Sequence, residues 1–230
     1  MPARDFIQAN TKLLPVPLVP EIRLYLAEES LPIWQKTEEE FGAINVPPPY
    51  WAFAWAGGQA LARHLLDQTS LVAGRQVLDL GAGSGIAGIA AAKAGAAAVL
   101  AAEIDAYAIA AIALNAEANG VALSTIAGDL LAEAAPASCE VILVGDLFYE
   151  RPLAERVLHY IEQAQARQLL VLVGDPRRSY FPRDRFEAIA AYEVPVTREL
   201  EDAESKRTTV WRLRACPAPA GQEMAPPLRR

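Results

Sequence analysis

The feature that most constrains the fold is a short apolar segment that runs directly into a glycine-rich loop. Gln76–Leu80 has the apolar character of a buried strand, residues 81–85 (GAGSG) carry glycine at every second position, and an alanine-rich segment follows to residue 94. Glycines in such a loop let the backbone turn sharply and approach a ligand, and a following helix offers free N–H groups. The segment therefore predicts a strand, a ligand-binding loop and a helix over 85–94.

After this loop, apolar runs alternate with helical patterns. We expect strands at 98–102, 124–127, 141–145 and 169–174, and helices at 105–119 and 152–166. Strands that read as continuous apolar runs and are separated by helices indicate a parallel sheet covered on both faces. Segments 193–200 and 208–214 read as two strands joined by a charged loop. The expected fold is therefore α/β, a seven-stranded, mostly parallel sheet that ends in an antiparallel strand pair.

The first 49 residues read as an N-terminal helical extension of the same domain. Pro20 would occupy the first position of a helix over 21–29, and a second helix would begin at Ser30 and run to residue 41. Prolines 47–49 then predict a stiff connector, and residues 58–67 again show helical spacing. We expect one domain over residues 1–215 and a disordered, Pro-rich tail at 216–230.

Charge and composition narrow the class of protein. The chain has 21 Lys and Arg against 28 Asp and Glu, a formal net charge of −7, so it has no overall attraction to a phosphate backbone. The most apolar stretch, residues 77–118, is interrupted by charges and glycines, which favours a buried sheet over a membrane span. Two cysteines cannot form a disulfide framework and no signal peptide is visible, so we expect a cytoplasmic protein.

Two carboxylates flank the glycine loop at positions that suit a charged cofactor. Asp79 stands just before the loop, where it can face a cationic group, and Glu103 ends the next expected strand, where it can accept both hydroxyls of a ribose. A dinucleotide loop would need G-x-G-x-x-G, but its sixth position here is Ile86. We therefore favour S-adenosylmethionine over NAD. Either carboxylate alone could instead cap the loop or be an exposed strand end.

The order of strand, G-x-G-x-G loop, helix, strand and acidic residue resembles motifs I and II of the seven-stranded class I methyltransferases, over residues 76–214. The resemblance implies a Rossmann-like sheet. It also implies that Asp79 and the loop glycines hold the methionine end of the cofactor and that Glu103 binds the ribose; the glycines are Gly81, Gly83 and Gly85. Asp129 falls where such enzymes contact the adenine, although Gly-Asp is also a common turn.

A second group of candidate residues follows the fourth expected strand, in residues 145–150 (GDLFYE). Because the carboxyl ends of parallel strands open onto the ligand crevice, Asp146 could accept a hydrogen bond from an amine and Tyr149 could wall the acceptor. The pattern is a variant of the Asp-Pro-Pro-Tyr motif of amino-group methyltransferases, with Leu-Phe in place of Pro-Pro. A strand end followed by a core Phe-Tyr pair is the structural alternative.

Three stretches together resemble the lysine methyltransferases of the electron transfer flavoprotein β-subunit. They are Asn10-Thr11 with 20–23 (PEIR), 49–58 (PYWAFAWAGG) and 146–150 (DLFYE), within a likeness from about residue 5 to 214. The resemblance implies that Trp55 and Gly58 line the cofactor pocket, and that Asp146, beside the cofactor, and Tyr149 are the catalytic residues that meet the target lysine. Glu103 departs from the family, where many members have Asp, and Ala56 stands where Pro is common.

The expected function is S-adenosylmethionine-dependent protein-lysine N-methylation, with the electron transfer flavoprotein β-subunit as substrate. Alternatives within the same chemistry are another protein, such as a ribosomal protein, or a small amine. Alternatives of a different functional class are an NAD(P)-dependent oxidoreductase and a protein that binds a cofactor without catalysing a reaction. Neither His64 nor His159 has metal-ligand spacing, so we expect no metal, and we expect no nucleic-acid or membrane partner. The oligomeric state is left open, with a monomer favoured.

Overall fold

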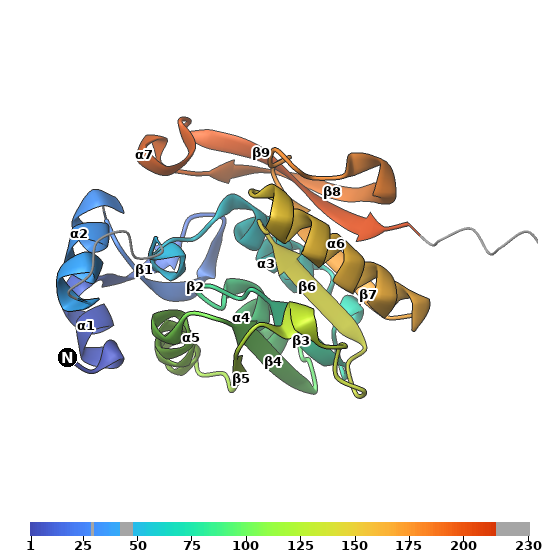
Figure 1. Ribbon diagram of the computed structural model, residues 1–230, viewed down its shortest axis with the longest axis horizontal. Helices are drawn as coiled ribbons and strands as arrows, with labels where there is room; N and C mark the ends of the chain where they lie inside the picture. The colour runs from blue at the N-terminus through green and yellow to red at the C-terminus, as the bar shows by residue number, and fades with distance from the viewer. Residues whose placement is uncertain (29, 42–47, 215–230) are drawn as a thin grey trace, which may run out of the picture.

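A seven-stranded sheet forms the centre of the computed structural model, which describes residues 1–28, 30–41 and 48–214 (Figure 1). The tail at 216–230 and the start of the proline connector at Pro47 lie outside the described residues. The strands are β3 (Gln76–Leu80), β4 (Ala98–Glu103), β5 (Ser124–Ala127), β6 (Val141–Gly145), β7 (Leu170–Asp175), β8 (Phe186–Pro195) and β9 (Ser205–Leu213).

The strand order is β5-β4-β3-β6-β7-β9-β8. Strands β3 to β7 pair in parallel, whereas β9 runs antiparallel to both β7 and β8. The predicted seven-stranded, mostly parallel sheet with a C-terminal antiparallel pair is confirmed. The predicted strand over 193–200 is wrong in its second half, because β8 ends at Pro195 and Arg198–Glu201 forms the one-turn helix α7.

Helices cover both faces of the sheet, as predicted (Figure 1). Three of them, α3 (Ala56–Asp67), α4 (Ile86–Lys93) and α5 (Ala106–Ala118), pack on one face, and α6 (Arg151–Ala166) packs on the other. Successive strand residues point to opposite faces, so Val77 enters the core beneath α3 and α4 while Leu78 enters the core beneath α6. Within the described residues, no helix is long and apolar enough to cross a membrane.

The N-terminal segment is not the purely helical extension that the sequence predicted. It contains α1 (Ala3–Asn10), an antiparallel hairpin of β1 (Lys12–Val16) and β2 (Val19–Leu26), and α2 (Ser30–Phe41). The predicted helix over 21–29 is therefore wrong, whereas the helix beginning at Ser30 is confirmed. The physical reason is a two-residue period: Ile22, Leu24 and Leu26 are buried and alternate with more exposed neighbours, which suits a strand with one buried face.

The hairpin packs on the face of the sheet that α3 and α4 cover, and it is hydrogen-bonded to α5. Val16, Val19 and Ile22 share one core with side chains of α3 and α4. The side-chain oxygen of Asn115 accepts a hydrogen bond from the backbone N–H of Tyr25 at 2.7 Å. Short 3-10 helices complete the fold at Tyr50–Ala52, Thr69–Leu71, Leu130–Ala132 and Arg183–Arg185.

Candidate active site

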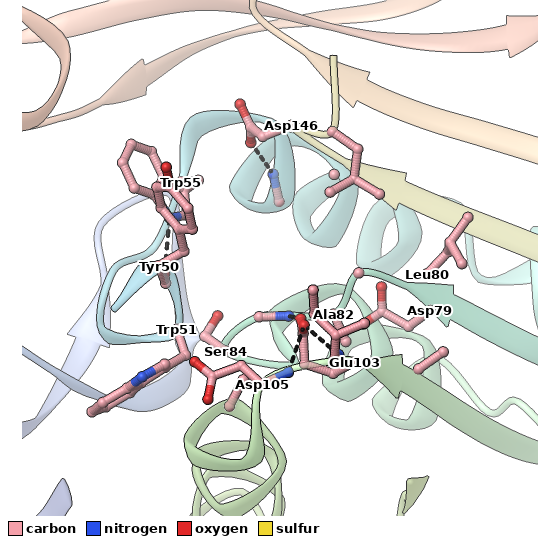
Figure 2. A pocket seen from close by; sticks show the side chains of 18 of the residues that line it. Tyr50, Trp51, Trp55, Asp79, Leu80, Ala82, Ser84, Glu103, Asp105 and Asp146 are labelled. Carbon is pink, nitrogen blue, oxygen red and sulfur yellow. Dashed lines mark hydrogen bonds between the residues drawn. The ribbon is translucent and has the colours of Figure 1, made fainter. Parts of the chain in front are cut away.

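A cavity of about 580 Å³ opens at the carboxyl ends of the parallel strands, where α/β sheets bind ligands (Figure 2). It brings together nearly all the residues that the sequence singled out. Those that line it are Trp55, Gly58, Asp79, Gly81, Gly83, Glu103, Asp129, Asp146 and Tyr149. Gly85, the last residue of the loop, is the exception, because it does not line the cavity.

The glycine loop adopts the backbone conformation that its composition predicts. Gly81, Gly83 and Gly85 have φ angles of +62°, +53° and +80°, a region that residues with a side chain rarely adopt. Gly85 also precedes the first residue of α4, and a Cβ there would lie 3.2 Å from the side chain of Ile112. Gly85 therefore serves the close packing of α4 against α5, while Gly81 and Gly83 face the cavity.

Asp79 lines the cavity and also binds the backbone of α4, and not that of the loop as the alternative interpretation had it. Its predicted role opposite a cationic group stays a prediction. Its carboxylate is buried and accepts a hydrogen bond from the backbone N–H of Gly88 at 2.7 Å. Burial is the largest influence on this group and raises its pKa to about 7, because a buried carboxylate loses its hydration. A cation entering the cavity would offset that loss.

Glu103 joins the end of β4 to the glycine loop. One carboxylate oxygen accepts a hydrogen bond from the backbone N–H of Gly83 at 2.9 Å, and the other accepts from the N–H of Ile104 at 2.7 Å. Figure 2 shows the side chain close to Ala82 and Asp105 on the same side of the cavity. A third N–H, that of Asp105, lies 3.4 Å from the same oxygen as that of Ile104. A carboxylate has about four lone-pair positions, so Glu103 keeps capacity for a further donor such as a ribose hydroxyl.

Asp129 lies beyond β5 at the more exposed end of the cavity. Its carboxylate accepts hydrogen bonds from the N–H of Leu131 at 3.2 Å and from Arg156 at 2.6 Å. Leu130 and Leu131 of the same turn, with Leu153 of α6, add an apolar wall. The position suits a flat heterocycle with polar edges. The predicted contact with adenine stays a prediction.

Asp146 occupies a constrained position where β6 ends. Its backbone has a φ of +57°, and one carboxylate oxygen accepts hydrogen bonds from the N–H groups of Gly57 and Gly58 at 2.5 and 3.1 Å. The other oxygen accepts two from Arg178, at 2.9 and 2.7 Å. These donors fill the lone-pair positions of the carboxylate. The predicted role of Asp146, accepting an N–H from a lysine, would therefore require one present donor to be exchanged.

Tyr149 is one of three rings at the cavity that we call the aromatic rim: Tyr50, Trp55 and Tyr149. The ring centroids of Tyr50 and Tyr149 are 5.6 Å apart, and those of Tyr50 and Trp55 are 5.8 Å apart. The indole N–H of Trp55 donates to the backbone oxygen of Tyr50 at 2.9 Å (Figure 2). Burial raises the pKa of Tyr149 to about 12, so its hydroxyl stays protonated at neutral pH. The rim can surround an aliphatic stem.

Sequence reasoning did not identify Arg178 as a site residue, nor did it give Tyr50 a role. Arg178 follows β7 and lines the cavity beside Asp146. The available signal was its place in 175–178 (DPRR), directly after the fifth parallel strand, because every such strand end faces the same crevice. Tyr50 stood within a quoted stretch, but nothing local marked it as facing the cavity.

The residues that line the cavity fit S-adenosylmethionine. Buried Asp79 suits an ammonium group, Glu103 suits a ribose diol, and the leucines around Asp129 suit adenine. Among the described residues, no group of His, Cys, Asp and Glu side chains could hold a metal ion. The fold and this site together define a seven-stranded methyltransferase that uses S-adenosylmethionine.

Comparisons with known proteins place the chain within this class. The family model of ribosomal protein L11 methyltransferase (PrmA) matches residues 59–147, the cofactor-binding part. The electron transfer flavoprotein beta subunit lysine methyltransferase of Danio rerio is 34% identical over 220 residues, which cover 93% of this chain and 84% of the relative. The Caenorhabditis elegans homologue is 35% identical over 211 residues, 85% of this chain and 84% of the relative. The chain belongs to the electron transfer flavoprotein β-subunit lysine methyltransferase family.

Solved structures agree on the fold. A protein of Pyrococcus horikoshii that is named as a candidate RNA methyltransferase superposes with a TM-score of 0.52 at 18% sequence identity, over 73% of this chain and 89% of that one. At this level of identity the likeness concerns the fold alone.

Proposed function

We propose that this protein methylates a lysine of the electron transfer flavoprotein β-subunit. One observation carries the proposal: the likeness to relatives named for that substrate extends over 93% of the chain. The match to the L11 methyltransferase model, by contrast, is confined to residues 59–147. A likeness limited to the cofactor-binding part would support methyl transfer without indicating an acceptor, whereas this one includes the aromatic rim and the C-terminal strands.

In this proposal the cofactor lies along the cavity from Asp79 to Asp129. Asp79 holds the ammonium group, Glu103 the ribose hydroxyls, and the turn at Leu130 and Leu131 the adenine. When bound, the cofactor supplies a methyl group whose bond to a sulfonium sulfur breaks as the amine nitrogen attacks, leaving S-adenosylhomocysteine. The protein contributes mainly alignment, because holding nucleophile and methyl group in line removes much of the entropic barrier.

The target lysine would reach the cavity through the aromatic rim. A free lysine has a pKa of about 10.4, so few amines are neutral and nucleophilic at pH 7. Burial of the amine lowers that pKa, because desolvation disfavours the ammonium form. Tyr149 and Trp55 would pack along the aliphatic stem, Asp146 would help to position the amine, and the released proton would pass to water.

The proposal is tested by methylation of purified substrates. The enzyme is incubated with labelled S-adenosylmethionine and, in separate reactions, with electron transfer flavoprotein, ribosomal protein L11 and small amines. We expect label on a lysine of the flavoprotein β-subunit, located by mass spectrometry of its peptides. Ribosomal protein L11 is the sharpest competitor because its methyltransferase model matches the chain. Labelling confined to L11 or to small amines would overturn the proposed acceptor.

A further inference from the structure

A buried ion network connects the acceptor end of the cavity to the C-terminal strand pair. The guanidinium of Arg178 donates two hydrogen bonds to Asp146 and two to Glu201 of α7, the latter at 2.8 and 2.5 Å. Glu201 also pairs with Lys206 of β9. The guanidinium carbon of Arg178 also lies 5.7 Å from the ring centroid of Trp55. Arg178 therefore contacts a rim residue and Asp146 at the same time.

The network is shielded from solvent. The side chains of Arg178, Asp146 and Glu201 are 16%, 10% and 3% exposed. Burial by itself lowers the pKa of Arg178, but Glu201 and Asp146 outweigh this and raise it above its ordinary value, so the guanidinium stays charged. A buried ion pair gives little net stability, because desolvation offsets much of the attraction. Stability alone is therefore a weak reason for three charged groups to meet here.

Arg178 resolves a conflict in the chemistry of the site. A carboxylate beside the acceptor lysine would stabilise the ammonium form and so oppose nucleophilic attack. The positively charged guanidinium of Arg178 lies against the carboxylate of Asp146 and donates two hydrogen bonds to its Oδ1. With its charge offset, Asp146 still holds the first turn of α3 through Gly57 and Gly58, but it attracts an incoming ammonium less strongly.

We propose that Arg178 is a positioning residue for methyl transfer, which fixes Asp146 and offsets its charge so that the lysine amine is neutral at the cavity. The inference rests on the proposed lysine acceptor. Arg178 acts through Asp146 and need not touch the substrate. Its second pair of hydrogen bonds, to Glu201, anchors it to α7 in the connection between β8 and β9.

Charged groups from several elements face Arg178 and enter any pH dependence. They are Asp146 after β6, Asp175 at the end of β7 and Glu201 on α7, and Glu201 in turn pairs with Lys206 on β9. Asp175 accepts a hydrogen bond from the backbone N–H of Arg178 at 2.7 Å, and its other oxygen is buried with no hydrogen-bond partner in the described part of the chain. Burial, then the charge of Asp146, raises the pKa of Asp175 to about 7. Arg178 lowers the pKa of Asp175 and Asp146 raises it, so a substitution at either position also moves this titration.

The test compares pH profiles of kcat for protein-lysine methylation in the wild type, Arg178→Met, Arg178→Lys and the double variant Arg178→Met with Asp146→Asn. The kcat should increase with pH as the lysine amine loses its proton, and we call this increase the rise of the profile. In Arg178→Met we expect kcat at pH 7.5 to fall about tenfold to a hundredfold, and the rise to shift to a higher pH by about one unit or more. Arg178→Lys keeps the charge but loses the paired geometry, so kcat falls while the rise stays in place. The double variant removes the unpaired carboxylate and returns the rise toward its wild-type pH.

Arg212→Met is the matched control, because Arg212 pairs with Glu187 on the exposed side of the same strand pair and lies outside the cavity. We expect the wild-type profile from it. A purely structural role for Arg178 would lower activity equally at every pH and leave the position of the rise unchanged, which would overturn the inference. If Arg178→Met does not fold, wild-type kcat in Arg178→Lys overturns it instead. Absence of protein-lysine labelling by the wild type would contradict the proposed function and not this inference in particular.

Discussion

At the scale of single residues, burial gives Asp79 a property that its place in the sequence could only suggest. A carboxylate with a pKa of about 7 is partly protonated at neutral pH. An ammonium group brought close to it favours the ionised form and lowers the pKa again. Ligand binding should then expel a proton from this side chain, and binding should strengthen as the pH rises.

The corresponding prediction concerns S-adenosylhomocysteine, which carries the same ammonium group. We expect its affinity to rise between pH 6 and pH 8, with net proton release near pH 7, measured by calorimetry in buffers of different ionisation enthalpy. Asp79→Asn should bind more weakly and lose the Asp79 part of the release. The pH dependence of stability runs the other way from that of binding. Because the pKa of Asp79 in the folded protein exceeds the unfolded value of about 3.9, its titration stabilises the folded state fully below about pH 4, and this stabilisation declines as the pH rises to about 7. Equal proton release in the wild type and in Asp79→Asn would contradict the prediction that Asp79 binds the ammonium group.

Tyr149 and Tyr180 form a matched pair for testing the aromatic rim. They are 37% and 40% exposed, but Tyr149 lines the cavity and Tyr180 does not. We expect Tyr149→Ala to raise the KM for the protein substrate and to lower kcat by about tenfold or more, because the lysine stem loses a wall that aligns it. Steady-state kinetics would show Tyr180→Ala close to wild type. Equal effects of the two substitutions would contradict the rim as the lysine entrance.

At the scale of elements, a close approach of backbones positions the site. The first turn of α3 lies directly against β7, and a Cβ added at Gly57 would meet both the backbone oxygen of Gly174 and the carboxylate of Asp146. Only because both facing residues are glycines can the first N–H groups of α3 reach Asp146. Helix N-terminal N–H groups lack partners within the helix, so Asp146 satisfies donors that would otherwise stay unpaired.

Asn115 on α5 and Asn119, the residue that follows this helix, test how the N-terminal hairpin supports the loop. Asn115 is fully buried: its oxygen accepts from Tyr25 of β2 and its nitrogen donates to the backbone oxygen of Ser84 in the glycine loop. Asn119 also pairs with β2, through Arg23, in a more exposed position. Asn115→Ala leaves one buried and one partly buried backbone group unpaired and should cost about 2–4 kcal/mol in the free energy of unfolding. Asn119→Ala should cost less than about 1 kcal/mol.

Urea denaturation followed by circular dichroism measures both values. We also expect Asn115→Ala to weaken cofactor binding, since Ser84 belongs to the loop that lines the cavity. A loss of stability in Asn119→Ala as large as that in Asn115→Ala would show that burial does not determine the strength of this connection.

The sequence predicted the elements whose signals are local and missed contacts between distant residues. Continuous apolar runs and spaced glycines identified β3, β4, β6, β7 and the loop, because a buried parallel strand and a positive φ each demand particular residue types in place. The edge strand β5 is exposed along its whole length, so its sequence signal was weaker. The rule for proline at a helix start failed at Pro20, where a two-residue period decided the structure. Arg178 was missed because its partners Asp146 and Glu201 lie 32 and 23 residues away.

At the scale of the whole molecule, the N-terminal hairpin is part of the same core as the sheet and its helices. Val16, Val19, Ile22 and Leu24 are completely buried and pack with residues of α3 and α4. Full burial of such a side chain is worth about 1.5–3 kcal/mol. Their combined contribution is therefore comparable with the net stability of a typical domain, about 5–15 kcal/mol.

Deletion of residues 1–27 should therefore prevent the chain from folding stably, although every residue predicted for the cofactor and the acceptor would remain. We expect the deletion variant to lose the cooperative thermal transition of the full chain and to show no stabilisation by S-adenosylhomocysteine, because a ligand raises stability only where a native site exists to bind it. Deletion of residues 216–230 is the control: its Pro-rich sequence predicts an unchanged Tm. A cooperative transition in the N-terminal deletion within a few degrees of the full chain would show that the sheet and helices fold without the hairpin.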